Sequence, residues 1–163
     1  MNLFIAVLLE NYELANSLEE NGITQDDLEM FHIVWEKHDP YATQFIKLSN
    51  LSNFLSELES PLGVTKPNDK AMALFNLPII DKEMIHSLDV LHAVTKYACG
   101  EIEEDKEFDD MQMRLDLQFL KYYPIRLNHV PLTSTIQRKK QDLAVRKIQK
   151  AYKNYLVKKK LKA

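Results

Sequence analysis

The distribution of charge divides this chain into two parts that cannot fold in the same way. From Arg126 to Ala163 there are twelve Lys or Arg residues against a single acid, Asp142. The preceding 125 residues carry nine basic and 23 acidic side chains, so a net charge of −14 is followed by +11. A chain of 163 residues with 45% apolar content is sufficient for one domain with a core plus an appendage. The sequence therefore predicts an acidic folded domain followed by a basic extension.

The basic part contains an apolar stripe with helical spacing. Ala144, Ile148, Ala151 and Tyr155 are four, three and four residues apart, which places them on one face of a helix. A basic amphipathic helix is typical of docking peptides for acidic, groove-bearing partners such as calmodulin, and of membrane-surface helices. Docking on the chain's own acidic domain is a further alternative. We expect no nucleic-acid partner, because tyrosines share the aliphatic face of this helix.

The acidic part is predicted to be all α-helical, with paired helices joined by tight loops. Thr24 is followed three residues later by Asp27, which indicates a helix start. This helix should end near His38, because Pro40 disfavours helical geometry at Asp39. Nothing alternates with a period of two for long, so any strands should be very short. Further helices are predicted over Leu48–Leu58, Ala71–Asn76, Asp81–Cys99 and from Glu101 to Pro124.

The segment between the first two predicted helices has the layout of an EF-hand, in which a 12-residue loop joins two helices. With Asp39 at loop position 1, positions 3, 5, 6 and 12 fall on Tyr41, Thr43, Gln44 and Asn50. A calcium loop needs several oxygen ligands, glycine at position 6 and a bidentate carboxylate at position 12. Tyr41, Gln44 and Asn50 lack these properties. We therefore expect a degenerate loop that binds no calcium.

A second candidate loop, near Leu77–Asp89, is less suitable for calcium than the first. Pro78, Ile79 and Ile80 stand where ligands are required. In the first loop, by contrast, Ile46 falls at position 8, where EF-hands place an aliphatic residue. The sequence thus predicts an EF-hand-like scaffold without its metal.

Nothing in the sequence indicates an enzyme, a metal centre or a cofactor. The single Cys99 excludes an internal disulfide and a multi-Cys zinc site, and no His and Asn are paired with it to make a nucleophile. Three glycines in the whole chain disfavour a Gly-rich phosphate loop. The acids between Glu101 and Asp110 form a charge run rather than a positioned acid–base pair.

The N-terminal apolar run Leu3–Leu9 is too short to span a bilayer, which needs about 20 residues. It fits either a buried helix or the cytoplasmic end of a transmembrane helix. Asn2–Tyr12 resembles the cytoplasmic end of the last pore-lining helix of voltage-gated sodium channels, and Phe31–Ile46 resembles the first EF-hand-like unit of their C-terminal domain. Further matches to this family follow in order at Glu59–Leu62, Lys66–Asn68, Ile85–Leu91, Pro131–Thr135 and Ile148–Gln149.

The resemblance spans nearly the whole chain and is greater to the invertebrate sodium or sodium/calcium channel type than to a typical vertebrate one. It implies that residues 1–17 are the cytoplasmic end of the last pore-lining transmembrane helix. Residues 18–125 would then form an all-α EF-hand-like domain, and residues 126–163 a linker and a long basic helix with an IQ motif. Such a chain is a regulatory tail on the cytoplasmic side of the plasma membrane that modulates channel inactivation.

In this family the EF-hand-like domain does not need calcium, and calmodulin binds the IQ helix. Fibroblast growth factor homologous factors bind the globular domain, and the tail contacts the inactivation linker of the channel. The residues that the motif assigns to calmodulin are Ile148, Gln149, Tyr152, Lys153, Tyr155 and Lys158. The alternatives are the tail of a voltage-gated calcium channel and a soluble EF-hand-like adaptor. Thr43–Ile46 and Leu8–Asn11 favour the sodium type.

Overall fold

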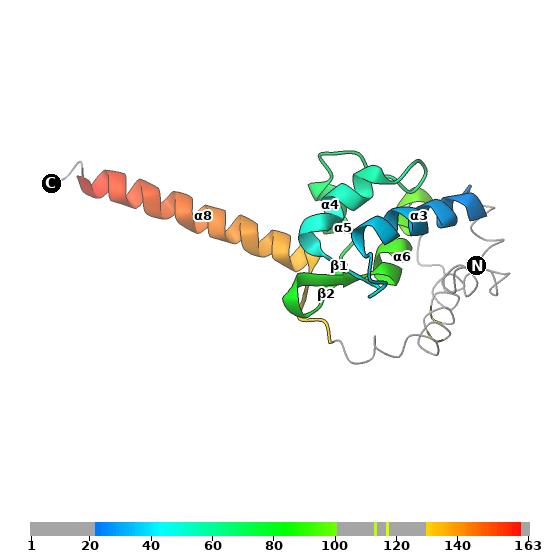
Figure 1. Cartoon of the computed structure of the whole chain (residues 1–163). Helices are drawn as coiled ribbons and strands as arrows, with labels where there is room; N and C mark the ends of the chain where they lie inside the picture. The colour runs from blue at the N-terminus through cyan, green and yellow to red at the C-terminus, as the bar shows by residue number, and fades with distance from the viewer. Residues whose placement is uncertain (1–21, 101–112, 114–116, 118–129, 161–163) are drawn as a thin grey trace.

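Two helix–loop–helix units share one core in this computed structural model, which describes residues 22–100 and 130–160 together with Met113 and Leu117 (Figure 1). The first unit consists of α3 (Gln25–His38), β1 (Phe45–Lys47) and α4 (Leu48–Glu57). The second unit consists of α5 (Asp69–Leu74), β2 (Pro78–Ile79), the 3-10 turn η1 (Asp81–Glu83), β3 (Met84–His86) and α6 (Ser87–Ala98). Together the two units form what we call the globule.

Farther along the chain, β4 (Thr133–Ser134) leads directly into the long helix α8 (Thr135–Lys160). Figure 1 shows α8 projecting away from the globule. The predicted fold class, an EF-hand-like globule of paired helices followed by a long basic helix, is confirmed. The strands are two or three residues long, as expected.

Helix α3 begins and ends where local chemistry predicts. Thr24 Oγ1 accepts a hydrogen bond from the Asp27 N–H, and the Thr24 N–H donates to the Asp27 carboxylate at 2.8 Å. This reciprocal capping box satisfies donors that the first turn of any helix leaves unpaired. At the other end the Asp39 N–H still reaches the Trp35 carbonyl at 2.9 Å, and the helix stops at His38. Both predicted ends of this helix are confirmed.

Three aromatic rings form the centre of the core. Phe54 of α4 meets Phe31 and Trp35 of α3 edge to face, with ring centroids 5.2 and 5.1 Å apart. Phe31 and Trp35 stack on each other at 5.8 Å. Both geometries are favourable for aromatic pairs. Aliphatic side chains of both units complete the core, and the fully buried ones include Ile23, Ile46, Leu51, Leu55, Leu62, Leu77, Ile79, Ile85 and Leu88.

The two loops are joined by an antiparallel pair of strands, β1 and β3, in which Ile46 lies opposite Ile85. This pairing corrects the predicted helix over Asp81–Cys99, because α6 begins only at Ser87. Residues Met84–His86 form backbone hydrogen bonds with β1 instead of helical ones. His86 then caps α6, since its Nδ1 accepts a hydrogen bond from the Leu88 N–H at 3.1 Å.

Helix α8 is attached to the second unit through its first residue and through β4. Strand β4 pairs antiparallel with β2, and Ile79 lies opposite Thr133. The Leu77 N–H donates to Thr135 Oγ1, and the Thr135 N–H donates to the Leu77 carbonyl, both at 3.0 Å. The start of α8 is therefore fixed on the globule by backbone pairing and by the Thr135 hydroxyl.

Among the helices of the described ranges, none has both the length and the apolar character needed to cross a bilayer. The predicted membrane-helix end at residues 1–17 and the predicted helix from Glu101 lie outside the described residues. The domain boundaries after residues 17 and 125 stay predictions.

Candidate functional site

In the first loop, the Asp39 carboxylate accepts hydrogen bonds from residues of the loop itself. Asp39, at loop position 1, is only 6% exposed. Its Oδ1 accepts hydrogen bonds from the Thr43 N–H at 3.0 Å and from the Thr43 hydroxyl at 2.8 Å, and its Oδ2 accepts one from the Gln44 N–H at 2.6 Å. Both carboxylate oxygens are thus directed at the loop backbone. That calcium does not bind here stays a prediction, and this bonding supports it.

The other residues assigned to the degenerate loop have structural surroundings of their own. Gln44 has φ of 68°, the left-handed conformation for which calcium loops use glycine at position 6. Its side chain and carbonyl accept hydrogen bonds from the Ser87 hydroxyl at 3.0 Å and from the Ser87 N–H at 2.9 Å. Tyr41 is 88% exposed, and Asn50 lies in the first turn of α4. The structure brings Asp39, Thr43 and Gln44 together, but not Tyr41 and Asn50.

A segment from far along the chain, residues 133–138, packs along one edge of the second loop. In addition to the β2–β4 pairing, Ser134 donates its hydroxyl to Asn76 Oδ1 at 2.7 Å. Arg138 on the first turns of α8 forms an ion pair with Glu83 at 2.8 Å. Glu83 itself has φ of 60°, so the turn is strained. The sequence does not predict this contact, because no local pattern links residues so far apart in the chain.

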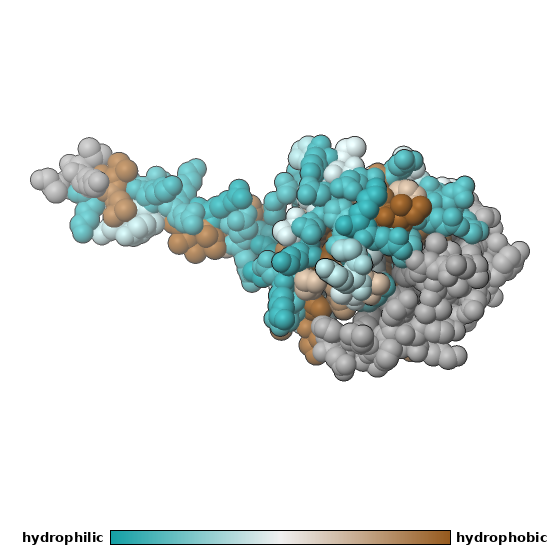
Figure 2. Space-filling model, in the orientation of Figure 1, coloured by the Kyte–Doolittle hydropathy of each residue, from teal (hydrophilic) through white to brown (hydrophobic). Residues whose placement is uncertain are grey.

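The six residues that the motif assigns to calmodulin all lie on α8 and are all exposed. Ile148 is 68% exposed, Tyr152 60% and Tyr155 59%, which is unusual for large apolar side chains. Figure 2 shows hydrophobic residues alternating with hydrophilic ones along the projecting helix. Every residue from Leu143 to Lys159 is exposed, so this part of α8 does not dock on the globule. The alternative of intramolecular docking is therefore not observed.

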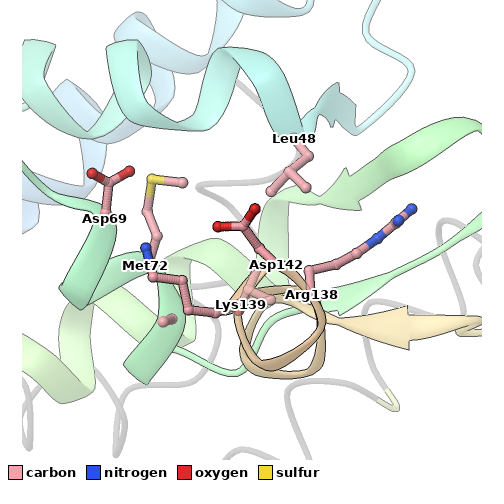
Figure 3. A pocket seen from close by; sticks show the side chains of 8 residues that line it. Leu48, Asp69, Met72, Arg138, Lys139 and Asp142 are labelled. Atoms are coloured by element: carbon pink, nitrogen blue, oxygen red, sulfur yellow. The ribbon is translucent and has the colours of Figure 1, made fainter. Parts of the chain in front are cut away.

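A small groove lies where the first turns of α8 meet α5 and the start of α4 (Figure 3). Its volume is about 200 Å³, below the range of about 300–1,000 Å³ that ligand pockets occupy. Acidic and basic groups alternate around it, so its charge favours no particular ligand. We interpret it as a gap left by the packing of α8 against α4 and α5 rather than as a ligand site. The residues that line it are Leu48, Asp69, Met72, Ala73, Thr135, Arg138, Lys139 and Asp142.

Catalytic or metal chemistry finds no support in the part of the chain that the structure describes. No group of three or more His, Cys, Asp or Glu side chains within it could hold a metal ion. Burial raises the pKa of the Cys99 thiol above its usual value, which lowers the fraction of reactive thiolate at neutral pH. The exposed face of α8 is therefore the candidate functional site.

Comparison with known proteins shows that the chain is similar to one segment of sodium channel proteins. It is 46% identical over 162 residues to sodium channel protein 60E of Drosophila melanogaster, a match that covers 99% of this chain and 6% of that protein. It is 45% identical over 153 residues to sodium channel protein 1 brain of Heterololigo bleekeri, covering 93% of this chain and 10% of that protein. By sequence, this chain is homologous to a segment of sodium channel proteins.

The sodium channel match extends to vertebrates at lower identity. Human sodium channel protein type 2 subunit alpha is 39% identical over 162 residues, 99% of this chain and 8% of that protein. The chain thus spans no more than a tenth of the length of these sodium channel relatives. No protein-family profile matches it. The predicted resemblance to sodium channel alpha subunits is confirmed, and the names of these relatives denote channels rather than enzymes.

Proposed function

We propose that this chain is the cytoplasmic regulatory tail of a voltage-gated sodium-type channel at the plasma membrane, and that calmodulin binding to α8 modulates inactivation. The observation that carries the proposal is the solvent-exposed apolar face of α8 on a helix with ten Lys or Arg residues and one acid. Such a helix, attached only at its beginning, presents a peptide that a partner can surround.

The spacing of the exposed anchors supports calmodulin in particular. Ile148, Tyr152 and Tyr155 are related as i, i+4 and i+7, the pattern by which amphipathic helices occupy hydrophobic grooves. The lysines around them complement an acidic partner. Gln149, Lys153 and Lys158 are also exposed and complete the set that the motif assigns.

The globule would act as a calcium-insensitive platform in this proposal. The Asp39 carboxylate accepts three hydrogen bonds from Thr43 and Gln44, so the loop holds its conformation through its own donors. Calcium would then act through calmodulin rather than through the globule. Fibroblast growth factor homologous factors and the inactivation linker of the parent channel are the further partners that we propose for the globule.

Calorimetric titration of calmodulin into the whole chain, with calcium and with chelator, tests the proposal. We expect binding in at least one condition. Ile148→Glu should weaken it at least 30-fold, as expected for an anchor worth about 2 kcal/mol or more. Val157→Glu is a matched control, because Val157 is 58% exposed but lies on the opposite side of α8 from Ile148. No heat in either condition, or equal losses for the two variants, would refute the proposal.

A further inference from the structure

One continuous surface of α8 remains uncovered in the structure. At 100° per residue, seven residues between Leu143 and Val157 fall within an arc of about 140°. The large members of this surface are between 38% and 68% exposed. We call it the apolar face of α8, and it consists of Ala144, Val145, Ile148, Ala151, Tyr152, Tyr155 and Leu156.

Cations flank the apolar face, and the single acid of α8, Asp142, pairs with one of them, Arg146, at 3.0 Å. Between Leu143 and Lys159 there are six Lys or Arg residues and no Asp or Glu. Lys147 lies about 110° from the centre of the apolar face, whereas Lys150 lies about 170° away, at the back of the helix. A flanking lysine can lay its methylene stem along an apolar surface and extend its ammonium group to a neighbouring anion.

The globule does not obstruct this face. The residues of α8 that are partly or fully buried against the globule include Thr135, Ile136, Lys139 and Asp142. On the same helical wheel these lie on the side opposite to the apolar face. A flat surface can therefore approach the apolar face while the root of α8 stays attached to β2.

We propose that the apolar face of α8 binds the surface of an anionic lipid bilayer. Tyr152 and Tyr155 match the boundary between acyl chains and headgroups, because each has an apolar ring and a polar hydroxyl. The flanking lysines match lipid phosphates and carboxylates, and each cation near such a surface raises affinity about five-fold. The inference rests on the proposed function for its source of membrane, the inner leaflet beside the channel. Calmodulin and the bilayer then compete for one face.

Binding of the whole chain to lipid vesicles tests this inference. Vesicles of phosphatidylcholine with one quarter phosphatidylserine should bind the chain at physiological salt at least ten-fold more tightly than vesicles of phosphatidylcholine alone. The neutral vesicles also report any contribution of the Leu3–Leu9 run, which does not depend on lipid charge. Equal binding to both vesicles, or none, would overturn the inference. No calmodulin is present, so this proposal and the calmodulin proposal can fail separately.

Two charge-reversal variants distinguish binding of α8 in one orientation from non-specific electrostatic attraction to the bilayer. Lys147→Glu and Lys150→Glu change the charge equally, on exposed residues three positions apart. In the oriented complex the Lys150 ammonium lies roughly 6 Å farther from the lipid, against a screening length of about 8 Å, so its contribution to the binding free energy is about halved. We expect losses of roughly 25-fold for Lys147→Glu and roughly five-fold for Lys150→Glu. Equal losses would contradict the orientation.

Fluorescence provides a direct measure of contact. Trp35 is the single tryptophan of the chain and is buried in the core at 3% exposure, beyond the reach of lipid. In a Tyr152→Trp variant, brominated lipids should quench the new tryptophan and leave Trp35 unaffected. If brominated anionic vesicles do not quench the introduced tryptophan, contact through the apolar face is excluded.

Discussion

Replacing Thr135 with valine should weaken the attachment of α8 to the globule by about 1–3 kcal/mol. The Leu77 N–H donates to Thr135 Oγ1 at 3.0 Å, and the two residues are 1% and 6% exposed. Valine has nearly the shape of threonine but no acceptor, so the Leu77 N–H would remain buried without a partner. Leaving a buried donor unpaired has this cost, and the second hydrogen bond, from the Thr135 N–H to the Leu77 carbonyl, survives in the variant.

Urea denaturation followed by the fluorescence of Trp35 measures the loss of stability, and hydrogen exchange of the Leu77 amide locates it. Thr133→Val is the matched control, because the Thr133 hydroxyl contacts Gln137 at 3.0 Å on the surface and its removal should cost less than about 0.5 kcal/mol. Slow exchange at Leu77 in the Thr135→Val variant would refute the reasoning. Equal losses of stability for the two variants would refute it as well.

Two other substitutions test the globule. Asp39→Ala should lower the free energy of unfolding by about 1–3 kcal/mol in calcium-free buffer, because the Thr43 and Gln44 donors lose their acceptor. Calcium should not alter the melting temperature of the unsubstituted chain. A calcium-dependent increase would show that the loop binds metal. Gly63→Ala should destabilise the globule by about 1–3 kcal/mol, because a Cβ there would collide with the Leu58 carbonyl oxygen. A melting temperature unchanged by Gly63→Ala would contradict the close approach.

The parts of the fold that the sequence predicted are those that depend on neighbouring residues. The capping box of Thr24 and Asp27 and the end of α3 before Pro40 follow from contacts within one turn of helix. The degenerate first loop was recognisable because EF-hand positions have fixed chemical requirements, which Tyr41 and Gln44 do not meet. The long basic helix was visible as an apolar stripe among lysines.

The parts that the sequence did not predict depend on distant partners. Met84–His86 continues a helical pattern in the sequence, but pairing with β1 across some forty residues prevails over that local preference. The β2–β4 pairing joins segments separated by an even longer stretch, and two-residue strands have no periodicity to detect. For the candidate site, the motif assigned the residues of α8. Only the structure showed that the globule covers the side opposite to the apolar face.

Cutting the chain just before residue 131 would destabilise the acidic domain as well as remove α8. Ile79 is buried in the core, and its carbonyl accepts the Leu132 N–H at 2.9 Å, while Leu77 relies on Thr135. Without the downstream segment, the Ile79 carbonyl and the Leu77 N–H lose these partners, and a buried polar group left unpaired costs about 1–3 kcal/mol. Proteolysis or a premature stop codon in this region would therefore reduce the amount of folded protein. Loss of activity in such a shortened chain would therefore reflect lower stability of the acidic domain as well as the missing basic helix.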